Sequence, residues 1–128
     1  MILKTQRKNK MKKLHLIFNH NIFDSPYKQS SVNKMDKEIL SLFKEDDVDL
    51  FLSLTSTQSP NQFTYDADLI IVEHSFNLSA EQKHDIAAII NKSLAKLKSA
   101  DPIDVLVSFR KTDENDLFFF KDGKDDNI

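Results

Sequence analysis

Short apolar runs alternate along the chain with longer segments in which apolar residues recur every three or four positions. The runs have the length and the branched side chains of strands, and the longer segments are typical of amphipathic helices. The pattern predicts strands at Leu14–Phe18, Val48–Leu54, Ala67–Ser75 and Ile103–Phe109, helices beginning near Pro26 and Ser79, and a short tail strand at Leu117–Phe120.

Both predicted helices have recognisable starts. Asp24 and Ser25 precede Pro26, which stands at a first helical position where its missing N–H has no cost. Ser79 is followed three residues later by Gln82, the spacing of a capping box. The order of elements is therefore β-α-β-β-α-β. It predicts an α/β (α+β) domain in which two β-α-β units form a four-stranded sheet with both helices on one face.

The strands contain too many consecutive apolar residues for a sheet with one wet face. Such a sheet should alternate apolar and polar residues, but residues 69–72, 105–107 and 117–120 are unbroken apolar runs. Two helices can cover only one face. The sequence therefore predicts that a second copy covers the other face, in a homodimer or homotrimer.

Charge is unevenly distributed along the 128 residues. Residues 1–13 contain six of the 18 lysines and arginines and no acid, so the remainder has a net charge of −8. An acidic body repels phosphate backbones, which argues against a nucleic-acid partner. No apolar run approaches the ~20 residues of a membrane span, and the run at 14–18 is shorter than the about 7–15 residues of a secretory signal core. We expect a cytoplasmic protein without a membrane partner.

The basic charge of residues 1–13 predicts a disordered leader. We expect one domain at 14–123 and a disordered tail at 124–128. Residues 1–13 have two other interpretations. Translation could start at Met11, or the segment could be an arm that binds nucleic acid or a membrane surface.

Two residue types are informative by their scarcity. The chain has no cysteine, which excludes disulfides, thiolate catalysis and thiolate metal sites. Its single glycine, Gly123, excludes a glycine-rich phosphate loop. Glu81 and His84 have a spacing found in metal sites, but no second copy of the motif exists, and a solvated helix face is the simpler interpretation. We therefore expect neither a cofactor nor a metal.

Three side chains are candidates for chemistry. His74 lies near the end of the third predicted strand and His15 in the first, where a histidine can act as a general acid or base. Arg110 ends the fourth strand, where its guanidinium can bind a carboxylate through two parallel hydrogen bonds. For both His74 and Arg110 an ordinary surface residue is the competing interpretation.

Three segments are similar to those of a known family. They are His15-Leu16-Ile17 at the start, the third strand through Phe76 with the helix from Ser79, and Phe118-Phe119-Phe120-Lys121-Asp122-Gly123 at the end. Together with the element order, they resemble the tautomerase superfamily, which includes macrophage migration inhibitory factor. The greatest similarity is to a bacterial branch of tautomerase-like proteins whose function is not characterised. The resemblance covers about residues 14–123 and implies a tautomerase-like sheet and an oligomer.

The resemblance also implies a mechanism that this chain lacks. The family transfers a proton with an amino-terminal proline, whose amine stays neutral in an apolar pocket. In this match the proline position falls on Leu14, and residue 12 after Met11 is a lysine. Only Arg110, His15 and His74 then remain as pocket candidates.

Three hypotheses follow from different classes of protein. The first is a tautomerase-like protein without proline-based activity that binds a small carboxylate or other anion. The second is an active keto–enol isomerase with a non-proline base. The third is a ferredoxin-like regulatory or interaction module, which has the same element order but a different sheet.

Overall fold

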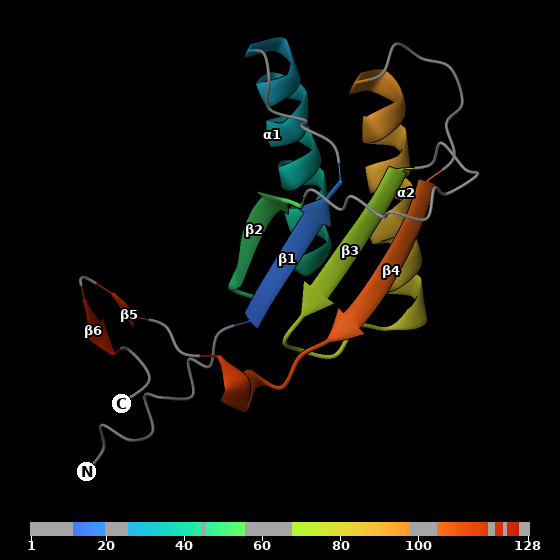
Figure 1. The fold of residues 1–128 in the computed structure, drawn as a ribbon. Coiled ribbons are helices and arrows are strands. Elements are labelled where there is room, and N and C mark those ends of the chain that lie inside the picture. The colour runs from blue at the N-terminus through green and yellow to red at the C-terminus, as the bar shows by residue number, and fades with distance from the viewer. Residues whose placement is uncertain are drawn as a thin grey trace, which may run out of the picture.

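Two β-α-β units join edge to edge in one four-stranded sheet (Figure 1). The structure, a computed structural model, describes residues 12–19, 26–44, 46–55, 68–97, 105–117, 120–121 and 123–125. The described elements are β1 (Lys12–Phe18), α1 (Pro26–Leu40), the 3₁₀ turn η2 (Ser41–Phe43), β2 (Val48–Leu54), β3 (Asp68–His74), α2 (Ala80–Leu97), β4 (Val105–Lys111), the 3₁₀ turn η3 (Glu114–Asp116), β5 (Phe120–Lys121) and β6 (Lys124–Asp125).

The strand order β2-β1-β3-β4 decides between the two topologies that the sequence left open. β1 pairs in parallel with β2, and β3 pairs in parallel with β4. β1 and β3 are antiparallel neighbours at the centre. Each unit thus has its own parallel pair, with a helix as the crossover, which is the tautomerase-like arrangement. The ferredoxin-like alternative, which pairs its strands antiparallel throughout, is wrong.

Both helices lie against the same face of the sheet (Figure 1). This face, called here the covered face, contains the hydrophobic core. Alternation along the strands places Leu14, Leu16 and Phe18 of β1 on it, each at most 1% exposed. The helices contribute apolar residues at helical spacing. The buried set from the helices and η2 is Val32, Met35, Ile39, Phe43, Ile86, Ile90, Leu94 and Leu97.

The start of α2 confirms the predicted capping box. The Gln82 amide donates to the Ser79 hydroxyl at 3.0 Å, and the Ser79 amide donates to the Gln82 side-chain oxygen at 2.9 Å. Two N–H groups that have no partner inside the helix are satisfied reciprocally. The predicted cap of α1, Asp24-Ser25, and the predicted stop of α2 at Ala100–Pro102 lie outside the described residues.

Some boundaries differ from those expected from hydrophobicity. β2 has the predicted bounds, but β1 begins at Lys12, two residues inside the expected leader. Backbone pairing of Lys12 with Val48 and of Lys13 with Asp49 extends β1 through two residues that have no apolar side chain themselves.

The predicted strand at 117–120 is also corrected. Leu117 is in no strand, and residues 118–119 lie outside the described part. Phe120–Lys121 instead pairs with Lys124–Asp125, part of the expected disordered tail, in a separate hairpin whose turn includes Gly123 at φ +77°. Only glycine adopts this backbone conformation readily.

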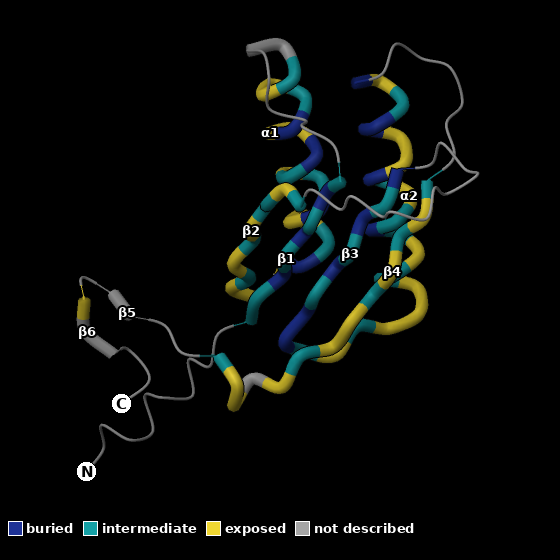
Figure 2. Tube along the Cα trace, in the orientation of Figure 1, coloured by how far each residue is buried: buried dark blue, intermediate teal, exposed yellow. Residues whose placement is uncertain are grey.

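Burial falls from the centre of the sheet to its edges (Figure 2). The central strands β1 and β3 alternate buried with half-buried residues, whereas β2 and β4 alternate half-buried with exposed ones. The face of the sheet away from the helices, called here the open face, is therefore accessible mainly along its outer strands.

Candidate functional site

The alternation of β1 separates two of the predicted site residues. Leu14, at the position that the resemblance gives to proline, is fully buried on the covered face. His15, the next residue, lies on the open face. Arg110, like His15, lies on the open face, so Leu14 and Arg110 lie on opposite faces of the sheet.

His74 is buried on the covered face beside Leu14, and its contacts there support the fold. It is 3% exposed and pairs with Leu14 across β1 and β3. Its Nδ1–H donates to the Phe76 carbonyl oxygen at 2.7 Å. Its ring meets Phe109 edge-on, with 6.3 Å between the ring centroids. A hydrogen bond and an aromatic contact hold this imidazole in the core, away from His15 and Arg110.

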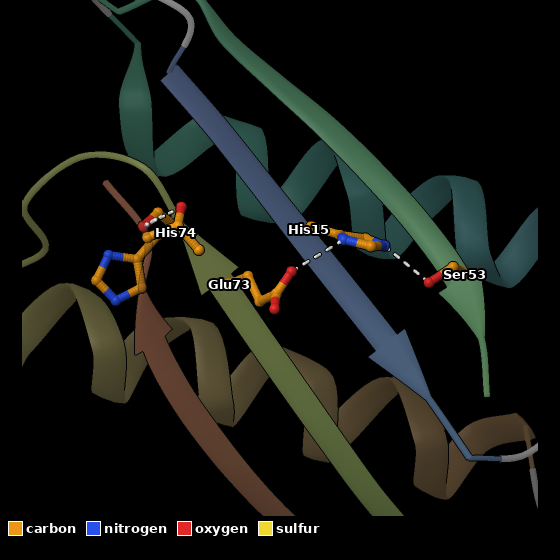
Figure 3. Close-up of polar contacts among 5 residues, drawn as sticks. His15, Ser53, Glu73 and His74 are labelled. Atoms are coloured by element: carbon orange, nitrogen blue, oxygen red, sulfur yellow. Dashed lines mark hydrogen bonds and ion pairs between the residues drawn. The ribbon is translucent and has the colours of Figure 1, made fainter. Parts of the chain in front are cut away.

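His15 bridges two side chains from the neighbouring strands (Figure 3). Its Nε2 lies 2.7 Å from the Ser53 hydroxyl oxygen on β2. Its Nδ1 lies 3.4 Å from Glu73 Oε1 on β3. Because each ring nitrogen has its own partner, the two contacts fix the orientation of the imidazole ring. His15 is a predicted site residue, whereas Ser53 and Glu73 are not among the predicted ones.

Arg110 lies in the same cross-strand row as His15. The register pairs Phe51 with His15, His15 with Glu73, and Glu73 with Arg110. Arg110 is exposed, and within the described part of the chain its guanidinium forms no hydrogen bond or ion pair. Its donors therefore face solvent at the end of the row, next to the His15–Glu73 contact.

The open face is more apolar on the side of this row that contains Ile17 and Ile71. Ile17 and Ile71 form the next row, flanked by Ser53 and Ser108. Beyond them Leu69 pairs with Leu106, which is 59% exposed. The prediction of strands that are apolar on both faces thus holds for this end of the sheet and is wrong for the end with Lys13, Glu73 and Arg110.

The first residue of β1 is a lysine with an ion-pair partner. Lys12 Nζ lies 2.8 Å from Asp46 Oδ1, and both side chains are substantially exposed. An exposed pair of this kind contributes little to stability. The chain has three prolines, at residues 26, 60 and 102, so none lies in or before β1.

The described residues form neither a metal-binding cluster nor a membrane-spanning helix. No group of three or more histidine, aspartate or glutamate side chains there could hold a metal ion. No described helix is long and apolar enough to cross a membrane.

Solved structures with the same topology include proteins of several activities. Macrophage migration inhibitory factor from Toxoplasma gondii matches with a TM-score of 0.57 and 10% identity, over 79% of this chain and 90% of that one. A protein of unknown function from Vibrio cholerae matches at 0.60 and 20%, over 88% and 86% respectively. A malonate semialdehyde decarboxylase matches at 0.58 and 17%, over 85% and 91%.

The chain therefore has a tautomerase-like fold, as the resemblance implied. No protein-family model matches the sequence, and no curated protein matches it. At identities of 10 to 20% the likeness extends to the fold alone, so the chemistry has to be derived from this chain's own residues.

Proposed function

We propose that this tautomerase-fold protein does not use proline-based proton transfer and instead binds a small carboxylate on the open face through Arg110. The observation that carries the first half is the absence of proline from β1, which begins with Lys12 and continues with the buried Leu14. The side-chain amine of Lys12, which contacts Asp46 at 2.8 Å, is a primary amine and no substitute for the secondary amine of an amino-terminal proline.

Arg110 supports the second half. A guanidinium presents paired donors whose geometry matches the two oxygens of a carboxylate. Glu73 lies opposite Arg110 in the register and faces His15 at 3.4 Å, so that the row contains an acidic as well as a basic side chain. Selection of one small carboxylate by geometry, rather than of anions in general by charge, follows from this arrangement.

Titration with phenylpyruvate, followed by NMR, tests binding directly. We expect Arg110→Ala to weaken binding at least about tenfold, because a charge-assisted hydrogen bond contributes roughly 1.5–3 kcal/mol. Arg110→Lys should also bind more weakly, since lysine cannot form the paired contact. The matched control is Lys111→Ala, which removes the neighbouring charge that donates to Asn77 at 2.6 Å. Equal binding by wild type and Arg110→Ala contradicts the proposal.

A second candidate, an active keto–enol isomerase with His15 as base, rests on the contacts of His15. An imidazole held by Ser53 and Glu73 is oriented as a general base needs to be. Turnover of enol phenylpyruvate or 4-hydroxyphenylpyruvate, lost in both His15→Ala and Arg110→Ala, would favour the isomerase. Binding without turnover would favour the first proposal.

We also infer that the protein associates with itself through the apolar end of the open face, as a homotrimer or homodimer. Leu69, Ile71 and Leu106 lie together there, and Arg110 lies at the opposite end of β4. A contact between copies at the apolar end leaves the polar row accessible at its rim. The cytoplasmic location and the absence of a nucleic-acid partner stay predictions.

A further inference from the structure

Three polar side chains from adjacent strands form one continuous chain of contacts on the open face. Ser53 of β2 touches His15 Nε2 at 2.7 Å, and His15 Nδ1 faces Glu73 Oε1 of β3 at 3.4 Å (Figure 3). A hydroxyl, an imidazole and a carboxylate in this order are a nucleophile, its base and the group that orients the base. Ligand binding by Arg110 does not use the Ser53 hydroxyl, and enolisation by His15 uses it only to orient the imidazole, not as a reacting group.

We propose that Ser53 is a nucleophile activated by His15, with Glu73 as positioning residue, and that the protein hydrolyses small activated carboxylic esters. This activity goes beyond the proposed function. The 2.7 Å contact is within the range for proton transfer from a serine to its base. Glu73 Oε1 faces Nδ1 at 3.4 Å, and a carboxylate on this side favours the tautomer with its proton on Nδ1, which leaves Nε2 free to accept the Ser53 proton.

The surroundings of the three residues are half-shielded and reachable. The side chains of His15 and Glu73 are 23% and 27% exposed. Phe51 and Ile17 of the same face are the direct register partners of His15 and Ser53, respectively. An apolar rim of this kind favours a small aryl or alkyl ester and lowers the local dielectric around the imidazole.

A backbone donor for the developing oxyanion lies next to Ser53. The Thr55 amide donates to the Phe18 carbonyl oxygen at 2.8 Å, so it points toward β1. Successive N–H groups of a strand point in opposite directions, and the Leu54 N–H therefore points to the edge of β2, which no described strand pairs. The N–H of the residue after a nucleophile is one of the usual oxyanion donors.

The reaction balances with water as the only co-reactant. The Ser53 oxygen bonds to the ester carbonyl carbon while its proton passes to His15 Nε2, and the carbon–oxygen bond to the leaving alcohol breaks as that alcohol takes the proton. Water then attacks the acyl-serine carbon and gives a proton to Nε2. The acyl–oxygen bond to Ser53 breaks, Ser53 regains the proton, and a carboxylic acid is released.

Two measurements on the full chain test this chemistry: hydrolysis of 4-nitrophenyl acetate and butyrate, and labelling by a fluorophosphonate followed by intact mass and peptide mapping. We expect saturable hydrolysis and one phosphonyl group per chain, located on Ser53. Ser53→Ala should abolish labelling and lower kcat/KM at least about 100-fold. The matched control is Ser108→Ala, an exposed serine in the same row that lies beside Ile71 and should leave both unchanged.

The positioning role of Glu73 has its own readout. Glu73→Gln should lower kcat with little change in KM, and Glu73→Asp should restore part of the loss, whereas a residue that only supports the fold would not show this split. Circular dichroism confirms that each variant is folded. Labelling at a residue other than Ser53, no labelling of the wild type, or full hydrolysis by Ser53→Ala with loss in His15→Ala, which would make histidine the nucleophile, each overturns the proposal.

Discussion

The two faces of the sheet are built by the same strands and differ in what they require of the sequence. On the covered face, Leu14, Leu16 and Val72 are fully buried and pack against two helices. On the open face, Phe51 and Leu106 are 40% and 59% exposed, and a row of polar residues crosses the sheet. Alternation along each strand lets one set of residues stabilise the monomer while the other is available for contacts outside it.

This difference has a functional consequence. Most large apolar side chains of the covered face are buried or half-buried without any partner chain, so the monomer's core does not depend on the open face. Substitutions of open-face residues should therefore affect ligands, catalysis or assembly before they affect folding. The two faces can be tested separately by matched variants at adjacent positions of one strand.

The largest effect is expected from Leu16→Ala on the covered face. Removing a fully buried leucine side chain leaves a cavity, and we expect a loss of about 2–5 kcal/mol in the free energy of unfolding. Ile17→Ala, one residue further on the open face, should cost less than about 1.5 kcal/mol in dilute protein. Urea unfolding followed by circular dichroism measures both. Equal losses would mean that the faces are not independent.

The next effect concerns assembly. At micromolar concentration we expect light scattering to give a dimer or trimer for the wild type and a monomer for Leu106→Glu. A charge at this exposed apolar position opposes burial against a second copy. The free energy of unfolding measured at high dilution should be unchanged by the substitution. A wild type that is a clean monomer would remove the basis for self-association through this face.

The covered face was the easier one to predict from the sequence. The helix expected from Ser79 onward forms as α2 and buries Ile86, Ile90 and Leu94, and the Ser79–Gln82 capping box forms as expected. Local signals of this kind need only a few neighbouring residues. Sheet order is different, because a β-α-β-β-α-β sequence fits both antiparallel and parallel pairing of its outer strands, and only the structure separates them.

The open face shows why the candidate site could be predicted only in part. His15 and Arg110 stand out by residue type, but the contact of His15 with Ser53 joins residues 38 positions apart. Register, which single-sequence patterns do not provide, decides which residues meet. One signal was present: Ser53 interrupts the apolar residues 50–54 of β2, and Glu73 directly follows the apolar residues 69–72 of β3. Alternation also implies that the neighbours Leu14 and His15 face opposite sides.

The smallest effect concerns the partly buried carboxyl group of Asp36 in α1. Asp36 of α1 has one oxygen, Oδ1, that is buried and accepts no hydrogen bond within the described part of the chain. Burial raises the pKa of Asp36 to about 6, from 3.8. The folded state therefore holds this proton more tightly than the unfolded state, and stability falls as pH rises from about 4 to about 6 and is then level.

Asp36→Asn, which is neutral at every pH, should remove this dependence. We expect the variant to be more stable than the wild type by about 1 kcal/mol at pH 7, because solvent screening of a partly exposed carboxyl reduces the about 3 kcal/mol that the full pKa difference represents. At pH 4 the two should be equal within error. Asp49→Asn, at an exposed position on the open face, is the matched control and should give no such pH-dependent gain. Urea unfolding at pH 4, 5, 6 and 7 measures the difference, and a gain that is the same at every pH would show that the amide stabilises α1 by some means other than relief of a buried charge.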